Sequence, residues 1–582
     1  MMKSVISNVN CLVALLKQYS VKNVVLAPGA SDIPVIHIIE TDPFFTCYSV
    51  VDERSLVYFA MGVAQNINEP VACVCTSGTA VSNFLPGITE AFYQDVPIVA
   101  ITCDKNQNYQ GQIETQKIEQ VGIFGESVKK CVNLPVITNE EEFWLCERLV
   151  NEALIAMTHH GRGPVQINIP VIGDIGSYEE SEIPACKKID YIEKEDTILL
   201  NKYTHNKIKD FKKIMVVIGQ NHGLGQSDLM NLEKFAKSYN VIFAVDHLSN
   251  LSCFGAVNTY PITELEKEID ESLYPALVIS VGNNIASYDL KYIMRRINSV
   301  EHWQIDPAGR IRDVFHHLSA VFECSASFFF SEIDIGNVKD NNYLKLWEAE
   351  NDKIKINNLP FSSFYIANKL SRVIPENSIL HLAILNSTRL MQYFDLAKGV
   401  KVYSNFGALG IDGCMSSFMG QAYTTDELAF CLIGDLSFFY DMNAVGICHR
   451  KNNIRIILIN NSGAGEFYFT LGKQKISTID THIAATNCRI AKGWVESLGY
   501  QYYMVKDKKD VDEVFQKLNQ PSDQPVFVEV FLNIENDTNV TKEVYAKYRK
   551  QSKSELIKGK IKGVIGNEPY EALKQVYHKI KR

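Results

Sequence analysis

Three oxygen donors follow two buried strands in the last third of the chain. Asp435 stands just after the apolar run Leu428–Ile433, and Asn461 and Gly463 stand just after the apolar run Ile454–Ile459. A helical segment separates these predicted strands, so they should lie in a parallel sheet, where ligands gather at the carboxyl ends of the strands. A carboxylate, an amide oxygen and a backbone carbonyl are hard ligands suited to Mg²⁺, which keeps its other positions for phosphate and water.

A diphosphate fits the same place. A helix is expected over Ser437–His449, and the backbone N–H groups of Gly434–Ser437 lead into it. Such N–H groups have no partner within the helix and therefore bind anions. Taken alone, Asp435 would be interpreted as a helix cap. With Asn461 at the end of the neighbouring strand, metal binding is the stronger interpretation.

The composition limits the classes of protein to consider. A chain of 582 residues with 46% hydrophobic and 21% charged residues predicts roughly two to four globular domains. The net charge of −9 argues against broad nucleic-acid binding. The longest apolar runs are too short to cross a membrane, and the first residues fit an amphipathic helix better than a signal peptide. Fourteen scattered cysteines are typical of reduced thiols in a cytoplasmic protein.

The rest of the chain supplies the strands that must position these groups. Residues 1–185 alternate strands with helices, which predicts a doubly wound parallel sheet. Polar residues follow the strands predicted at Asn23–Ala27, Phe45–Val51, Pro70–Cys75 and Pro97–Thr102. Four more apolar strands within residues 200–335 predict a second α/β domain. The glycines after those strands do not form the GxGxxG pattern of a dinucleotide site.

A third unit, residues 360–540, contains the metal and diphosphate residues. Residues 541–582 are rich in lysine and predict a helical tail, either a solvated surface helix or an arm that contacts another subunit. The expected fold class is therefore α/β, with three doubly wound parallel-sheet domains at 1–185, 200–335 and 360–540 and a helical tail.

This order of domains and motifs resembles the thiamine diphosphate (ThDP) enzymes, which place pyrimidine-binding, central and diphosphate-binding domains in this order. One branch is especially similar, the 2-succinyl-5-enolpyruvyl-6-hydroxy-3-cyclohexene-1-carboxylate synthases of menaquinone biosynthesis. The segments that carry the resemblance are DERSLVYFAMG (52–62), TSGTAVSNFLPGITEA (76–91), GPVQINIP (163–170), ALGIDG (408–413) and GDLSFFYDMNAV (434–445). The resemblance covers roughly residues 1–540, and the combination of these words in one order is specific.

The resemblance implies ThDP and Mg²⁺ as cofactors and gives roles to matching positions. Glu53 matches the glutamate that pairs with the aminopyrimidine ring of ThDP, and Gln116 matches a glutamine near the reacting centre. The positions that match the metal site are Asp435, Asn461 and Gly463. Those that match the diphosphate cradle are Gly434, Leu436 and Ser437. Those that match the wall around the pyrimidine are Pro28, Gly29 and Thr79.

Glu53 suits its role chemically. ThDP becomes a nucleophile when it loses a weakly acidic carbon-bound proton, and the imino tautomer of its own pyrimidine can take that proton. A carboxylate in an apolar pocket favours this tautomer because a hydrogen bond is strong there. Glu53 lies between a predicted strand and an apolar helix, which is such a place. Without the motifs of the third unit, it would be interpreted as a solvated acid at a helix N-terminus.

The residues expected to bind substrate depart from the menaquinone branch. The family pattern SPGSRSTP occurs as APGASDIP, with Ser31 in place of an arginine and Asp32 beside it. The pattern NRGASGIDG occurs as NFGALGIDG, with Phe406 in place of a second arginine, and Lys105 replaces a third. Arginine forks bind carboxylates bidentately, and each lost charged hydrogen bond costs about 1.5–3 kcal/mol.

These departures lead to the hypothesis of a changed substrate. The chain would be a ThDP- and Mg²⁺-dependent 2-oxo acid decarboxylase or carboligase, forming a cofactor-bound enamine and transferring it to an acceptor. Asp32, and Glu466 before Phe467 where an apolar pair is expected, favour a neutral, hydroxylated or amino-bearing acceptor such as a sugar derivative. Three alternatives stay open: the menaquinone synthase itself, using 2-oxoglutarate and isochorismate; a ThDP oxidase with flavin in the central domain; and a non-catalytic homologue.

The resemblance also implies self-association. In this family, the glutamate and the metal ligands of one site come from different subunits, so the site would lie at the interface of a homodimer or homotetramer. The expected partners are therefore a second copy of the chain, a 2-oxo acid donor and an unidentified acceptor. No nucleic acid or membrane partner is expected, and the expected location is the cytoplasm.

Overall fold

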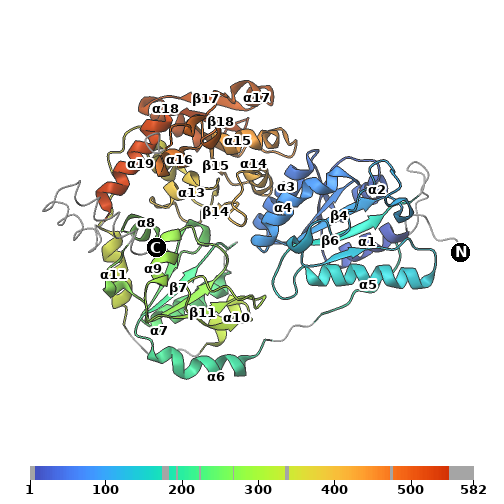
Figure 1. The fold of residues 1–582 in the computed structure, drawn as a ribbon, viewed down its shortest axis with the longest axis horizontal. Coiled ribbons are helices and arrows are strands. Elements are labelled where there is room, and N and C mark those ends of the chain that lie inside the picture. Colours follow the sequence, from blue (N-terminus) through green and yellow to red (C-terminus); the bar gives the residue numbers. More distant parts are fainter. Residues whose placement is uncertain are drawn as a thin grey trace, which may run out of the picture.

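The computed structural model describes residues 7–172, 183–191, 195–221, 225–266, 268–333, 340–471 and 476–549. In these residues the strands form three six-stranded sheets with helices packed around them (Figure 1). The predicted α/β fold with three parallel-sheet units is confirmed. Most of the predicted helical tail, 541–582, lies outside the described residues, and only the end of helix α19 (Ile534–Tyr548) falls within them.

The first sheet has the strand order β2-β1-β3-β4-β6-β5. Its central strands are runs of Val, Ile, Ala and Cys that are buried throughout, as expected when helices cover both faces. The strands are β1 (Asn23–Leu26), β2 (Thr46–Ser49), β3 (Val71–Cys75), β4 (Ile98–Asp104), β5 (Cys131–Asn133) and β6 (Val165–Pro170). The helices are α1 (Ser7–Gln18), α2 (Ile33–Thr41), α3 (Glu53–Ile67), α4 (Thr79–Tyr93) and α5 (Glu140–Ala156).

The second sheet has the order β12-β11-β10-β7-β8-β9. Its edge strands, β9 and β12, escape prediction because they are short or only half-buried and so lack an apolar run. The strands are β7 (Ile214–Ile218), β8 (Val241–Val245), β9 (Ala256–Asn258), β10 (Leu277–Val281), β11 (Glu301–Ile305) and β12 (Leu318–Phe322). The helices are α6 (Thr197–Lys207), α7 (Gln226–Ser238), α8 (Tyr260–Glu266), α9 (Tyr288–Arg295), α10 (Ala326–Glu332) and α11 (Asn342–Asn351).

The third sheet has the order β14-β13-β15-β16-β18-β17, so the two strands before the metal residues are neighbours. Its strands are β13 (Ile379–Leu382), β14 (Lys401–Tyr403), β15 (Ala429–Gly434), β16 (Ile454–Asn460), β17 (Gln501–Val505) and β18 (Val526–Phe531). Besides α19, its helices are α12 (Ser363–Val373), α13 (Asn386–Met391), α14 (Cys414–Tyr423), α15 (Asp435–Tyr440), α16 (Gly465–Thr470), α17 (Lys492–Ser497) and α18 (Lys508–Leu518).

The helix predicted over Ser437–His449 is wrong in its length. Helix α15 begins at Asp435 and ends at Tyr440, and a 3₁₀ turn follows over Met442–Gly446. Buried Asp441 lies between them and accepts hydrogen bonds from the Ser416 N–H at 2.8 Å and Oγ at 2.9 Å. This contact with α14 turns the chain out of the helix, which residue periodicity does not reveal.

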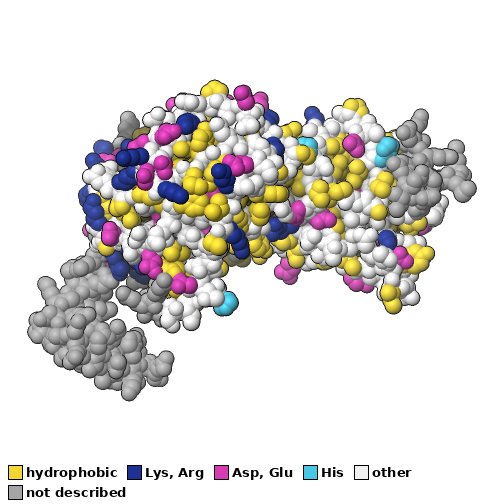
Figure 2. All heavy atoms as spheres, turned by 90° about the horizontal axis from the view of Figure 1, so that it is seen from above, with side chains coloured by type: hydrophobic (Ala, Val, Ile, Leu, Met, Phe, Trp, Pro, Cys, Tyr) yellow, Lys and Arg dark blue, Asp and Glu magenta, His cyan; other side chains and the backbone are white. Residues whose placement is uncertain are grey.

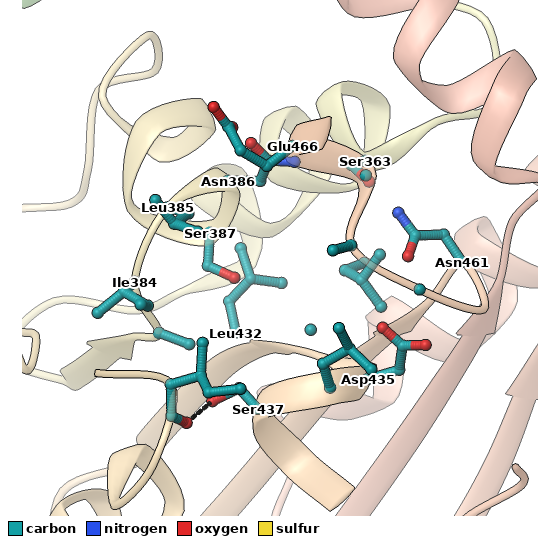
Figure 3. Close-up of a pocket in the computed structure, with 18 of the residues that line it drawn as sticks. Ser363, Ile384, Leu385, Asn386, Ser387, Leu432, Asp435, Ser437, Asn461 and Glu466 are labelled. Carbon is teal, nitrogen blue, oxygen red and sulfur yellow. Dashed lines mark hydrogen bonds between the residues drawn. The ribbon is translucent and has the colours of Figure 1, made fainter. Parts of the chain in front are cut away.

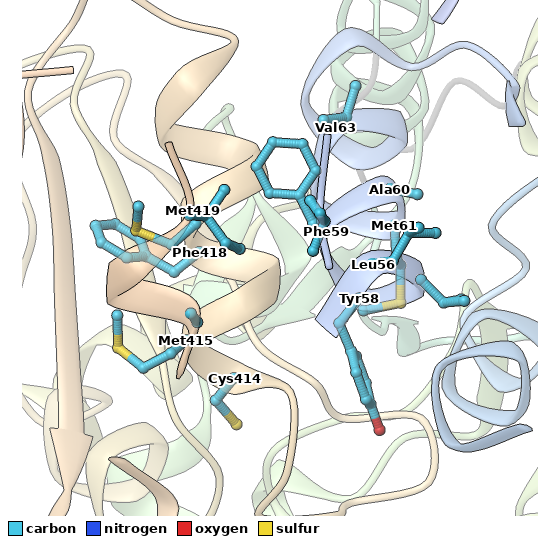
Figure 4. Close-up of a cluster of buried hydrophobic side chains, with 14 of the residues drawn as sticks. Leu56, Tyr58, Phe59, Ala60, Met61, Val63, Cys414, Met415, Phe418 and Met419 are labelled. Atoms are coloured by element: carbon cyan, nitrogen blue, oxygen red, sulfur yellow. The ribbon is translucent and has the colours of Figure 1, made fainter. Parts of the chain in front are cut away.

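The first and third units share one hydrophobic core, centred on the crossing of α3 and α14 (Figure 4). Glycines on both helices allow the backbones to touch. A Cβ on Gly62 would lie 2.0 Å from the Ser417 carbonyl oxygen, and one on Gly420 would lie 2.2 Å from the Phe59 carbonyl oxygen. The crossing therefore fixes the first sheet against the third. Among the described residues, every helix is too short or too polar to span a membrane.

Candidate active site

A pocket of about 750 Å³ opens at the carboxyl ends of β13, β15 and β16 (Figure 3). Its walls come from these strand ends and from the starts of α13, α15 and α16. The six residues that the sequence assigns to the metal and diphosphate all line it: Gly434, Asp435, Leu436, Ser437, Asn461 and Gly463.

Asp435 is a buried carboxylate, and in the part of the chain that the structure describes no basic side chain pairs with it. It is 2% exposed, and Asn487 Nδ2 donates to its Oδ2 at 3.2 Å. Burial raises the pKa of Asp435 to about 6, although the Asn487 amide and nearby backbone N–H groups oppose the rise. Among the described residues, no lysine or arginine lines the pocket. A buried anion without a cationic partner fits a site that a divalent ion completes.

Asn461 faces Asp435 across the pocket. Its Nδ2 donates to Asp537 Oδ2 at 3.2 Å, which leaves the amide oxygen turned toward the Asp435 carboxylate (Figure 3). Gly463 has no room for a side chain, because a Cβ would lie 2.8 Å from the Ala484 carbonyl oxygen. The Gly463 carbonyl accepts a hydrogen bond from the Gly465 N–H at 3.0 Å and keeps a second lone pair. Two of the three proposed ligands, Asp435 and Asn461, therefore face each other. The third is the backbone carbonyl of Gly463, which keeps one lone pair.

The start of α15 leaves open space for an anion. A Cβ on Gly434 would have no neighbour within 4 Å, although the residue lies on the pocket wall. The Ser437 hydroxyl donates to the Ile411 carbonyl at 2.6 Å, which ties α15 to the loop before α14 (Figure 3). The donor set and this space fit Mg²⁺ and a diphosphate.

The predicted residues of the first unit lie at the carboxyl edge of their own sheet. Glu53 is the first residue of α3 and follows the N-cap residue Asp52. Asn83 Nδ2 donates to Glu53 Oε2 at 3.1 Å. Pro28 and Gly29 follow β1, and Thr79 begins α4. None of these residues lines the pocket of the third unit. Within one chain, the structure therefore does not bring Glu53 into the same cavity as Asp435.

Asp32 lies close enough to Glu53 for their charges to interact. It is fully buried, and within the described part of the chain neither of its carboxylate oxygens has a hydrogen-bond partner. Burial, with a smaller contribution from the charge of Glu53, raises the pKa of Asp32 to about 6. Neighbouring Ser31 is also buried, and its N–H donates to Thr76 Oγ1 at 3.2 Å. Both residues are therefore buried in the loop that follows β1, beside the end of β3.

Gln116 and Lys105 lie on one loop beside the start of α4. Gln116 has a φ of +58°, in the left-handed region, and its Cβ would lie 3.4 Å from a Cβ on Gly78. Lys105 Nζ donates to Glu114 Oε1 at 3.1 Å and to the Thr115 carbonyl. Lys105 is therefore held by its own loop, next to Gln116.

Of the three remaining predicted substrate residues, one lines the third unit's pocket and two do not. Glu466 lines it, Phe467 is 40% exposed, and Phe406 is buried with its carbonyl bound to Asn284 Nδ2 at 2.9 Å. Sequence reasoning missed Arg389 of α13, whose Nη1 forms an ion pair with Glu466 Oε2. The only sequence signal is an arginine three residues after Asn386 at a strand end. Because Arg389 balances its charge, Glu466 is not a free acid.

Elsewhere, the described residues contain no cluster of three or more His, Cys, Asp or Glu side chains able to hold a metal. The pocket of the third unit therefore remains the candidate cation site. Its proposed ligands are one carboxylate, one amide oxygen and one backbone carbonyl. Only one of these comes from an acidic side chain, so the site is consistent with the absence of a three-residue His, Cys, Asp or Glu cluster in the described part of the chain.

Comparison with known proteins shows which family and which proteins this chain is similar to. The family description "Thiamine pyrophosphate enzyme, N-terminal TPP binding domain" matches residues 8–123, and the corresponding C-terminal TPP binding domain matches residues 386–530. A protein of Bacteroides fragilis named 2-succinyl-5-enolpyruvyl-6-hydroxy-3-cyclohexene-1-carboxylate synthase is 36% identical over 92% of this chain and 98% of its own length. Proteins of the same name from Phocaeicola vulgatus and Bacteroides thetaiotaomicron are 36% and 34% identical over the same shares.

Proposed function

Because the chain belongs to the thiamine diphosphate-dependent enzymes, we propose that it decarboxylates a 2-oxo acid and transfers the remaining carbon unit to an acceptor. The observation that carries this proposal is the pocket in which the Asp435 carboxylate faces the Asn461 amide oxygen at two adjacent strand ends. When bound, ThDP supplies the carbon nucleophile that decarboxylation of a 2-oxo acid requires, and Mg²⁺ binds its diphosphate.

The residues of the third unit hold the cofactor. Asp435, Asn461 and the Gly463 carbonyl would bind Mg²⁺ through oxygen, leaving positions for phosphate oxygens and water. The backbone N–H groups of Gly434–Ser437 would donate to the diphosphate. Burial of Asp435 supports this assignment, because the cation would remove the penalty of an isolated buried charge.

Glu53 would hold the proton that activates the pyrimidine. Its carboxyl group would share a proton with a ring nitrogen, and Asn83 Nδ2 orients the Oε2 atom. Gln116, on the loop against Gly78, would lie near the reacting carbon. Pro28, Gly29 and Thr79 would form the wall around the ring. A hydrogen bond to Glu53 is strong there if the closed site excludes water.

We propose that the complete site forms between two copies of the chain. Glu53 lies outside the pocket that contains Asp435, so a second chain is needed to bring the two halves together. Large hydrophobic side chains are exposed on both units, including Val51 and Ile113 on the first and Tyr440 and Phe467 on the third. Figure 2 shows hydrophobic side chains gathered on the face that these two units present. Such surface is typical of subunit contacts.

The acceptor is proposed to differ from that of the menaquinone enzyme. Ser31 and Phe406 stand where arginine forks would bind carboxylates, and Lys105 is held by Glu114. A second candidate is the menaquinone-pathway synthase itself. It is favoured by the identity to the three named relatives across nearly their whole length, and Arg389 would then have to exchange Glu466 for a substrate carboxylate.

One assay separates these two functions. Purified enzyme with ThDP and Mg²⁺ is given 2-oxoglutarate and isochorismate, and the product is identified by mass spectrometry. The proposal predicts CO₂ release from a 2-oxo acid but no efficient joining of these two compounds. Efficient formation of the joined succinyl product would establish the second candidate and overturn the changed acceptor.

A further inference from the structure

The last helix of the described chain touches the candidate metal site through one carboxylate. Asp537, in the first turn of α19, is 4% exposed and accepts three hydrogen bonds. Its Oδ1 accepts from the Ser363 N–H at 2.7 Å. Its Oδ2 accepts from Ser363 Oγ at 2.6 Å and from Asn461 Nδ2 at 3.2 Å. Both Ser363 and Asn461 line the pocket.

These hydrogen bonds determine which end of the Asn461 amide faces the pocket. An ionised carboxylate accepts hydrogen bonds and donates none, so only the NH₂ end of the amide can face Asp537. The oxygen must then face the opposite way, toward Asp435, as Figure 3 shows. With the amide reversed, a nitrogen that cannot bind a cation would point into the pocket, and two oxygens would oppose each other at Asp537.

Helix α19 is also attached to the loop that carries Asn461. It packs against α16, which follows that loop, and against α12, which begins at Ser363. Lys542 of α19 donates to the Tyr468 carbonyl of α16 at 2.9 Å. Tyr393 donates to the Tyr545 hydroxyl of α19 at 2.9 Å. Helix α19 therefore packs against both α12 and α16, the two helices next to Asp537.

We propose that Asp537 is a positioning residue for the cation: it holds the Asn461 amide with its oxygen toward the metal and thereby couples docking of α19 to cation binding. This inference rests on the proposed function, because it requires Mg²⁺ and ThDP to occupy the pocket. Residues that orient a metal ligand typically affect metal affinity by about 10–100-fold. Because the coupling is thermodynamic, the cofactor must also stabilise the docked helix.

The first test measures metal affinity directly. Mn²⁺, which is visible by EPR, replaces Mg²⁺ in titrations of the full chain with saturating ThDP. In Asp537→Asn, the new side-chain NH₂ opposes the Asn461 NH₂ and favours the reversed amide, so Mn²⁺ should bind about 10–100-fold more weakly. The matched control is Glu543→Gln, which neutralises an exposed carboxylate on the same helix away from the pocket, and it should bind Mn²⁺ like the wild type.

A double variant distinguishes positioning from general support of the fold. In Asn461→Asp with Asp537→Asn, the exchanged pair can form the same hydrogen bond in the other direction and again present an oxygen to the metal. It should recover most of the lost Mn²⁺ affinity. Unchanged affinity in Asp537→Asn, or a loss that the double variant does not recover, would overturn the proposal.

A second measurement needs no variant and so does not depend on folding of Asp537→Asn. Amide hydrogen exchange of the wild type is compared with and without Mg²⁺ and ThDP. Peptides from α19 should exchange more slowly with the cofactors, whereas peptides from α7 in the central unit should not change. Equal exchange of α19 in both states would contradict the coupling. A wild type that binds no Mn²⁺ with ThDP would instead overturn the proposed function.

Discussion

At the scale of single residues, the proposed function depends on two carboxylates with different surroundings. Asp435 is buried without a basic partner among the residues that the structure describes, and so fits a cation. Glu53 is the partly exposed first residue of α3 and is held by Asn83. Under the proposed function, Asp435 holds the cofactor and Glu53 activates it. This division predicts that the two residues fail differently when they are changed.

Glu53→Gln should separate turnover from cofactor binding. The amide keeps the shape of the side chain but cannot share the activating proton, so turnover should fall by about 10²–10⁴-fold. ThDP affinity should stay close to that of the wild type, because the metal and diphosphate contacts lie in the third unit. Steady-state kinetics and ThDP titration by intrinsic fluorescence measure both quantities. Exposed Glu40→Gln is the control, and unchanged turnover in Glu53→Gln would refute its assigned role.

Sequence reasoning could predict the residues that carry their own chemical signal. Asp435, Asn461 and Gly463 follow strands, and strand ends in a parallel sheet meet at one edge, so their shared pocket was within reach of the sequence. Arg389 and Asp537 were not, because each acts through a contact with a distant segment, Glu466 or Asn461. Because Arg389 forms an ion pair with Glu466, Glu466 is not the unpaired acid that the sequence alone suggests.

At the scale of elements, buried strands and their helices follow from apolar periodicity, whereas helix ends do not. The strand β16 was expected over Ile454–Ile459 and is found over Ile454–Asn460. The helix after β15 ends at Tyr440 because buried Asp441 binds the start of α14. Edge strands such as β12 lack a buried run and give no pattern to detect.

The crossing of α3 and α14 should be intolerant of a single methyl group. Gly420→Ala would place a Cβ 2.2 Å from the Phe59 carbonyl oxygen, and separating two packed backbones should cost about 1–3 kcal/mol or more. The thermal midpoint should therefore fall. Gly493→Ala on α17 is the matched control, because its Cβ meets nothing within 4 Å, and its midpoint should be equal or slightly higher. Equal midpoints for the two variants would contradict the packing at this crossing.

The contact of α8 with α9 should make stability depend on pH. Glu264 accepts hydrogen bonds from Ser287 Oγ at 3.0 Å and the Asp289 N–H at 3.2 Å. Burial, then the charge of Asp289, raises the pKa of Glu264 from 4.5 to about 7. The folded protein therefore binds a proton at the Glu264 carboxyl more tightly than the unfolded chain does. The charged carboxylate destabilises the fold above pH 7, by up to about 3 kcal/mol, and the penalty is relieved as the pH falls toward 4.5.

Glu264→Gln tests this sign. The amide is always neutral, so the thermal midpoint of the variant relative to the wild type should be higher at pH 8 than at pH 5. Hydrogen bonds lost with the substitution affect both conditions equally and cancel in the comparison. A midpoint difference that is the same at both pH values would show that Glu264 does not titrate in this range.

At the scale of the whole molecule, the two halves of the proposed site lie on different units. The first and third sheets are fixed by the α3–α14 crossing, and this arrangement leaves Glu53 outside the pocket of Asp435. The resemblance to ThDP enzymes that the sequence indicates is confirmed by the two matching cofactor-binding domains and by the relatives. The sequence could not predict where the halves meet, because that depends on surfaces rather than on motifs.

Mixing two inactive variants tests assembly between subunits. Glu53→Gln and Asp435→Ala each disable one half of every site in a homodimer. In a mixed dimer, one of the two sites receives both lesions and the other receives none. After dissociation and reassociation of an equal mixture, activity should return to about a quarter of the wild-type value, as expected for random two-fold pairing. If each site formed within one chain, every site would keep a lesion and the mixture would stay inactive.

The proposed function requires that this chain use ThDP and Mg²⁺ to remove CO₂ from a 2-oxo acid. The most direct measurement is CO₂ release from a panel of 2-oxo acids, with and without candidate acceptors, for the wild type and for Asp435→Ala. We expect CO₂ release from at least one 2-oxo acid, and this release should require both ThDP and Mg²⁺ and be lost in the variant. Folded wild type that binds ThDP and Mg²⁺ but releases no CO₂ from any of them would contradict it.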